Sequence, residues 1–190
     1  MPYKFWLNVL IILSSVFLYI LISKYHNIMP PKPKLNVQNF PRPPLLEKTP
    51  RHLLVKHQGH TIADTKDAYW VLETYHSPTY YLPKSCLTLP LKPTTKSTFC
   101  EYKGWATYYS ISLPSDDQGD ETEVSNRIWS YETPTEKYRD IKGYVSFYAG
   151  PWECFVDGEE VKAQPGDFYG GWTTSELEGI IKGSAETRWM

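Results

Sequence analysis

The sequence lacks the motifs that mark several large functional classes. Its 190 residues include only three cysteines, Cys86, Cys100 and Cys154, and an odd number at wide spacing is not typical of an oxidised scaffold. No glycine-rich loop opens a helix, so the motifs that cradle phosphates are absent. No Asn-x-Ser/Thr acceptor occurs either, which agrees with a domain that faces the cytoplasm.

Basic charge is also scarce outside the first 50 positions. Residues 1–50 carry six lysines and arginines against one acid, a formal charge of +5. The remaining 14 basic and 20 acidic residues give residues 51–190 a charge of −6. A domain without a basic stripe cannot neutralise a phosphate backbone, so we expect no nucleic acid as a partner.

An apolar run near the N-terminus predicts a membrane anchor. Residues 5–23 follow a short flank at 1–4 and are long enough to cross a bilayer as one helix. A cleaved signal peptide is the competing interpretation, but no small-x-small cleavage site follows the run. Lysines are more frequent after the run than before it. This bias predicts a single-pass membrane protein whose domain faces the cytoplasm.

Two further regions follow the predicted anchor. Residues 24–50 hold seven of the 16 prolines, which predicts a semi-extended basic linker. From residue 51 to 190 the chain shows short strands separated by turn residues, with no long helical period, and predicts one small, mainly β domain of antiparallel strands. An acidic stretch at 116–121 is interpreted as a solvated loop, and one short helix is expected near Thr135–Ile141.

The expected strands are rich in β-branched and aromatic residues. An Asp157-Gly158 pair predicts a two-residue hairpin turn near the C-terminus. The strands lie at Leu53–His57, Thr61–Ala63, Ala68–Thr74, Thr79–Leu82, Thr107–Leu113, Val124–Tyr131 and Tyr144–Ala149.

Five sequence segments recur in the same order as in a known family: 62–65 with 72–83, 97–109, 129–134, 141–148 and 154–183. On these segments the chain resembles the family called domain of unknown function 427. The resemblance implies a compact β-tent fold, similar to that of methionine sulfoxide reductase B. Some relatives of that architecture hold zinc between two Cys-x-x-Cys pairs, which this chain lacks. The family has also been labelled a nucleotidyltransferase, but no paired acidic motif follows a Gly-Ser loop here.

The Cys100–Lys103 segment is the first candidate site. A lysine close to a thiol can raise the thiolate fraction, which would make Cys100 a nucleophile or redox centre with Cys86 or Cys154 as a resolving partner. The alternative is that Cys100 is a small buried hydrophobe and Lys103 a solvated turn residue.

Glu73 and His76 form the second candidate. A carboxylate and an imidazole three residues apart beside a proline turn could transfer a proton near neutral pH. Alternatively, Glu73 binds a backbone amide or pairs with Lys103.

Aromatic side chains predict a small-molecule pocket. Such pockets combine apolar walls with a few polar groups, although packing in a thin core is the alternative use of these rings. The residues expected to contact a ligand are Tyr80, Tyr81, Tyr108, Trp129 and Glu101.

His57 and His60 flank a Gln-Gly turn and would face each other across a hairpin. Two ligands are too few for a metal, and His52 is a doubtful third, so no metal site is assigned. No cofactor is assigned either. The leading hypothesis is therefore a membrane-anchored domain that binds a small molecule. The alternatives are a non-catalytic protein-interaction domain at a membrane surface and a thiol-based redox enzyme that uses Cys100.

Overall fold

The computed structural model describes residues 32–113, 122–187 and 189. All of its strands belong to one compact unit, Lys34–Met190. The predicted anchor at 5–23 and the acidic stretch at 116–121 lie outside the described residues. Within the described ranges, no helix has both the length and the apolar character needed to cross a membrane.

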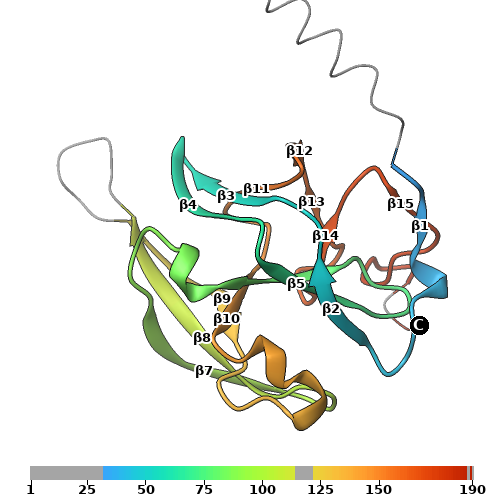
Figure 1. The fold of residues 1–190 in the computed structure, drawn as a ribbon, viewed down its shortest axis with the longest axis horizontal. Helices are drawn as coiled ribbons and strands as arrows, with labels where there is room; N and C mark the ends of the chain where they lie inside the picture. The colour runs from blue at the N-terminus through green and yellow to red at the C-terminus, as the bar shows by residue number, and fades with distance from the viewer. Residues whose placement is uncertain (1–31, 114–121, 188, 190) are drawn as a thin grey trace, which may run out of the picture. The chain divides into compact units, whose positions relative to one another are not determined.

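A seven-stranded antiparallel sheet forms the centre of this unit (Figure 1). The strand order is β2-β5-β6-β10-β9-β8-β7. Most neighbouring strands in this order are close in sequence, which is typical of antiparallel sheets joined by hairpins. The strands are β2 (Leu45–Thr49), β5 (Ala68–Leu72), β6 (Thr79–Pro83), β7 (Lys92–Cys100), β8 (Gly104–Leu113), β9 (Thr122–Ser130) and β10 (Tyr144–Phe147).

A second antiparallel sheet has four strands in the order β12-β11-β3-β4. Both of its hairpins turn through two residues with positive φ: Gln58 (48°) and Gly59 (80°), then Asp157 (52°) and Gly158 (83°). This backbone geometry matches the right-handed twist of the strands, and it confirms the predicted Asp-Gly turn. The strands are β3 (Leu53–His57), β4 (His60–Thr65), β11 (Glu153–Val156) and β12 (Glu159–Glu160).

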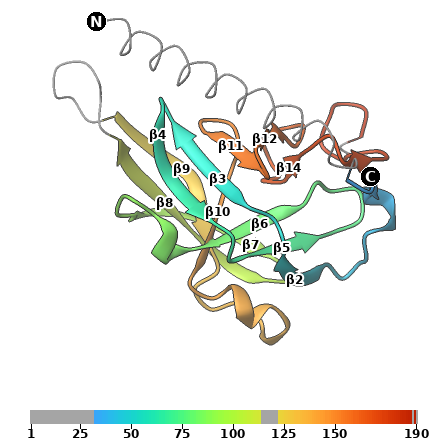
Figure 2. The ribbon, with the colours of Figure 1, turned by 45° about the horizontal axis from the view of Figure 1, so that its top comes forward.

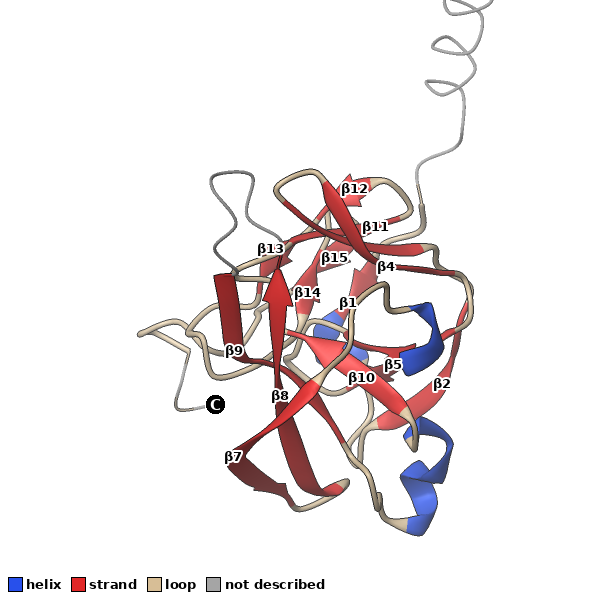
Figure 3. Cartoon of the chain, turned by 90° about the vertical axis from the view of Figure 1, so that its left-hand side faces the viewer, coloured by secondary structure: helices blue, strands red, loops and turns tan. Residues whose placement is uncertain are grey.

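Short elements complete the mainly β architecture (Figure 3). There are also two small strand pairs: a parallel pair that joins the two ends of the unit, and an antiparallel pair formed by segments close in sequence. The three helices described are single 3₁₀ turns or little more, and the last of them confirms the short helix expected near Thr135–Ile141. The elements are β1 (Leu35–Asn36), β13 (Lys162–Ala163), β14 (Trp172–Thr173), β15 (Leu177–Glu178), η1 (Val37–Asn39), η2 (Lys84–Cys86) and η3 (Glu136–Ile141).

The central sheet buries side chains on both faces. One face packs with the four-stranded sheet around a core that includes Leu53, Ile62 and Phe147 (Figure 2). The opposite face carries a second, more aromatic cluster that includes Tyr81 and Trp129. Because successive strand residues point to opposite faces, neighbours in sequence separate between the two clusters.

The structure corrects the predicted boundary of the linker at residue 50. β2 pairs with β5 over five residues, from Leu45↔Leu72 to Thr49↔Ala68, and Val37 is fully buried. Residues 34–49, which the proline content assigns to a linker, are therefore part of the folded unit. Strand β7 was not predicted, because most of its side chains are exposed and give no buried pattern.

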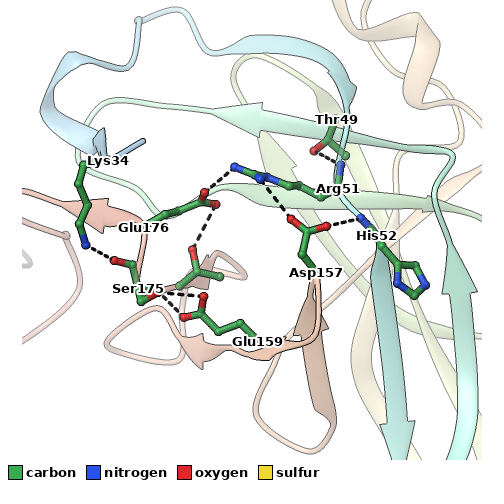
Figure 4. Close-up of polar contacts among 9 residues, drawn as sticks. Lys34, Thr49, Arg51, His52, Asp157, Glu159, Ser175 and Glu176 are labelled. Carbon is green, nitrogen blue, oxygen red and sulfur yellow. Dashed lines mark hydrogen bonds and ion pairs between the residues drawn. The ribbon is translucent and has the colours of Figure 1, made fainter. Parts of the chain in front are cut away.

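A polar network fastens the C-terminal segment to the second sheet (Figure 4). The Arg51 guanidinium donates to the Glu176 carboxylate at 2.5 Å and to Asp157 at 3.1 Å. The Glu176 side chain is only 2% exposed. Nearby, Glu159 accepts from the Ser175 amide at 2.5 Å. The two Arg51 contacts join residues more than 100 positions apart, whereas Glu159 and Ser175 are 16 positions apart.

Candidate functional site

A cavity of about 430 Å³ lies against the aromatic face of the central sheet. It is called the Tyr81 cavity here. Its volume falls in the range of small-molecule sites, and its lining is mostly aromatic with a few polar groups. Strands β5, β6, β8 and β9 supply the floor, the β7–β8 hairpin supplies one wall, and the segment 167–170 supplies the roof.

Tyr81 lies in the floor of the cavity. Tyr81 is 1% exposed, and its hydroxyl has no hydrogen-bond partner among the described residues. Burial raises the pKa of Tyr81, so the group is neutral and can both donate and accept. Trp129, Tyr108 and Tyr131 complete the floor beside it. Burial likewise raises the pKa of Tyr131, which keeps its hydroxyl neutral.

Tyr80, the preceding residue, lies on the other face of the sheet. It packs in the core between the sheets against Trp172, with ring centroids 5.3 Å apart, and does not line the cavity. The sequence predicts that both tyrosines contact the ligand. The alternation of β6 allows only one of them to reach it.

The wall brings Cys100 and Lys103 to the cavity together, as predicted. Cys100 pairs with Gly104 across the hairpin. Gly104 has a φ of +94°, which glycine adopts readily and which allows the tight turn. Lys103 is 8% exposed rather than solvated, and its ammonium lies 5.8 Å from the ring centres of both Tyr131 and Tyr138. These contacts are cation–π interactions.

The structure gives Cys100 no resolving thiol. All three cysteines are free. Cys86 and Cys154 pack with the core between the sheets, whereas Cys100 packs with the aromatic cluster on the other face. Burial raises the pKa of Cys86 to about 11 and that of Cys154 further, so neither is an activated thiol.

Glu73 and His76 both line the cavity near its roof. The carboxylate of Glu73 lies 3.6 Å from the guanidinium of Arg42, so the structure pairs it with Arg42 rather than with Lys103. His76 donates from Nδ1 to the Thr74 carbonyl oxygen at 2.8 Å, which leaves Nε2 as the acceptor of a neutral ring. Burial lowers the pKa of His76 and favours that neutral form.

Glu101, which was also expected at the ligand, does not line the cavity. Its side chain is 65% exposed and pairs with Arg42 at 3.3 Å on the outside of the hairpin. The turn at residues 101–103 sends Lys103 inward, and Glu101 remains on the outer side.

The roof is held down by contacts that sequence reasoning missed. Asp167 forms a bidentate pair with Arg127 at 2.6 and 3.1 Å, and Tyr148 donates to the Phe168 carbonyl oxygen at 3.3 Å. Both anchoring side chains lie far from the roof in sequence, so no local pattern could reveal them. By contrast, the sequence pattern could have identified Tyr131 as a residue of the cavity floor, because it follows Trp129 at the strand period of two.

His57 and His60 face each other in the β3–β4 hairpin, as predicted. His57 interacts with the Pro151 carbonyl oxygen at 3.1 Å and packs on the edge of Trp152. Within the ranges that the structure describes, no three His, Cys, Asp or Glu side chains gather closely enough to hold a metal ion.

Comparison with known proteins places the chain in a family. No curated protein is similar enough to supply an activity. The model of one family matches residues 45–162, which include the floor and the hairpin wall of the Tyr81 cavity but not its roof. On that match, the chain belongs to the family described as Domain of unknown function (DUF427).

Proposed function

We propose that this domain binds a small molecule in the Tyr81 cavity. The observation that carries the proposal is the aromatic-lined cavity itself, whose floor includes Tyr81, a residue whose buried hydroxyl has no hydrogen-bond partner among the described residues. Leaving a buried polar group unsatisfied costs about 1–3 kcal/mol, so such a group is expected to meet a ligand or an ordered water. The aromatic floor supplies apolar area around this one polar contact.

Glu73 and His76 could move a proton to or from a molecule bound there. His76 presents a neutral imidazole, and Glu73 is held by Arg42. Both line the same cavity as Tyr81. The proposal itself is for binding, and it requires no reaction.

Tyr80 provides a matched control for the test. Its hydroxyl is also buried without a partner among the described residues, but it lies on the opposite face of β6. The full chain, purified gently from its host cell, is compared by native and denaturing mass spectrometry. We expect a discrete mass difference in the wild type that is reduced in Tyr81→Phe and retained in Tyr80→Phe.

A wild-type protein that carries no added mass, and that binds no ligand in a fragment screen by ligand-observed NMR, would contradict the proposal. Equal loss in the Tyr80→Phe and Tyr81→Phe variants would also contradict it, because the effect would then come from general destabilisation. Thermal unfolding of both variants separates these cases.

One observation favours the alternative of a protein-interaction domain. Phe99 and Trp105 face each other across the β7–β8 hairpin with ring centroids 5.2 Å apart, and they are 63% and 62% exposed. Exposed aromatic pairs are common at protein interfaces. Trp105→Ser would weaken capture of a partner and leave ligand binding in the cavity unchanged, whereas Tyr81→Phe would do the reverse.

We also propose that residues 5–23 anchor the domain to a membrane as a single pass, with the domain in the cytoplasm. The apolar run and its flanking lysines support this proposal. Extraction with alkaline carbonate should leave the full chain in the membrane pellet, and protease should digest the domain only after the cell is opened. A mature N-terminus beyond residue 23 would refute the anchor.

A further inference from the structure

Lys103 lines the Tyr81 cavity and has no acidic partner among the described residues. The residue is 8% exposed, and within the described ranges it forms no ion pair or side-chain hydrogen bond. Its ammonium lies 5.8 Å from the ring centres of both Tyr131 and Tyr138. Ring faces offset part of the cost of burying a charge, and an anion would offset more.

The acids that line the same cavity face arginines outside it. Asp167 pairs with Arg127, and Glu73 lies 3.6 Å from Arg42, which it shares with Glu101 at 3.3 Å. Neither arginine lines the cavity. Asp167 therefore has its own counter-charge, Glu73 shares one, and neither forms an ion pair with Lys103 among the described residues.

A second lysine adds to the positive charge at the cavity. Lys96 lines the wall on β7, and its ammonium lies 4.2 Å from the ring centre of Tyr108. It forms no ion pair among the residues that the structure describes, although its charge helps to lower the pKa of Asp167 after the larger effect of Arg127. Once the paired acids are set aside, the cavity presents two cations to a ligand.

We infer that the ligand of the Tyr81 cavity is a small aromatic carboxylic acid whose carboxylate binds Lys103. This inference rests on the proposed function. Each lysine ammonium acts as a point charge, and no arginine lines the cavity to offer the planar fork that binds a phosphate at two points. A singly charged acid matches this arrangement. The aromatic body of the ligand packs on Trp129 and the surrounding tyrosines, and the Tyr81 hydroxyl supplies a second polar contact.

The test uses three probes that share one ring and differ in charge: phenylacetate, phenylacetamide and 2-phenylethylamine. Their binding to the full chain in lipid nanodiscs is measured by saturation-transfer NMR, with empty nanodiscs as the blank. We expect the acid to bind most tightly and the amine least. In Lys103→Met, the acid should lose affinity by about tenfold to a hundredfold, as expected for a charged hydrogen bond, and the amide should be unaffected.

Lys92→Met is the matched control, because Lys92 also lies on β7 but its ammonium donates to Ser112 outside the cavity at 3.1 Å. It should leave all three affinities unchanged. If Lys103→Met does not fold, Lys103→Gln removes the same charge with a polar side chain. The order of the three probes on the wild type needs no variant at all.

Equal binding of the three probes, or a preference for the amine, would overturn the inference while leaving a cavity that binds small molecules. Absence of binding by all three to the wild type would also overturn it. The native mass measurement then decides the proposed function separately. An acid preference that survives both Lys103→Met and Lys103→Gln would show that the charge recognition lies elsewhere and would overturn the inference as well.

Discussion

Gly170 packs directly against the indole of Trp129. A Cβ atom at position 170 would lie 2.0 Å from Cη2 of that ring, far inside contact distance. Only glycine therefore allows the roof of the Tyr81 cavity to come down onto its floor. The spacing between roof and floor, and with it the shape of the cavity, depends on the absence of one side chain.

Replacing Gly170 with alanine is expected to displace the roof. Overpacking of this kind costs about 1–3 kcal/mol of stability, and ligand binding in the cavity should weaken more than stability alone explains. Urea unfolding and ligand-observed NMR measure the two effects. Gly150→Ala is the control, because a Cβ there meets nothing within 4 Å, and it should change stability by less than about 0.5 kcal/mol. Equal effects of the two substitutions would show that the contact with Trp129 does not limit the roof.

The network in Figure 4 predicts a large loss of stability for Arg51→Met. The Glu176 carboxylate would remain buried, with its side chain 2% exposed, and lose its charged partner. Breaking one side of a buried ion pair typically costs about 3–5 kcal/mol. Arg139→Met removes an exposed pair with Glu136 and should cost less than about 1 kcal/mol. Urea unfolding of both variants provides the comparison, and equal losses would mean that the Arg51 pair is no more than a surface contact.

The pKa of His76 predicts how the roof region responds to acid. Burial lowers this pKa below the ordinary 6.5, and the positive charges of Lys182 and Arg42 add to the effect, while the bond to Thr74 and the charge of Glu73 oppose it. The unfolded state therefore binds more protons than the folded state below about pH 6.5, so His76 stabilises the fold above that pH and the contribution is lost as the pH falls.

The titration of His76 is measured from its imidazole resonances by NMR. We expect a midpoint below 6.5 and, above it, the neutral tautomer with the proton on Nδ1, which donates to the Thr74 carbonyl oxygen. A midpoint at or above 6.5, or a proton on Nε2, would contradict both the burial of the ring and its orientation.

The strands could largely be predicted from the sequence, because alternation and turn residues are local signals. Leu53–His57 and the Asp157-Gly158 hairpin are examples, since each is set by residues within a few positions. Local sequence does not predict which side of the sheet a residue faces. Tyr80 and Tyr81 look equivalent in sequence, and only the packing of the second sheet decides that Tyr81 faces the cavity.

The site was predicted in part for the same reason. Cys100 and Lys103 lie beside the turn at Gly104, Tyr108 and Trp129 lie on two predicted strands, and the structure brings all four residues to one cavity. The roof depends on contacts such as Arg127–Asp167, which join residues 40 positions apart and leave no local pattern.

The boundary of the folded unit is the last feature that can be tested by a simple change. Proline content assigns residues 24–50 to a linker, but β2 forms an edge of the central sheet and the Lys34 ammonium donates to the Ser175 carbonyl oxygen at 2.6 Å. The prolines of this region flank β2, at positions 43, 44 and 50, and none lies within the strand, so none removes a hydrogen bond from its pairing with β5. A chain that begins at Lys34 should therefore unfold cooperatively.

A chain that begins at residue 51 lacks β2 and the buried Val37, and it exposes the backbone and side chains of β5 that they cover. We expect it to unfold at a much lower urea concentration or to aggregate through the open edge. Urea unfolding followed by tryptophan fluorescence compares the two truncations. Equal stability would show that residues 34–50 do not contribute to the stability of the domain. A lower stability for the shorter chain alone would place them inside it and would set position 34 as the start of the unit in which the Tyr81 cavity forms.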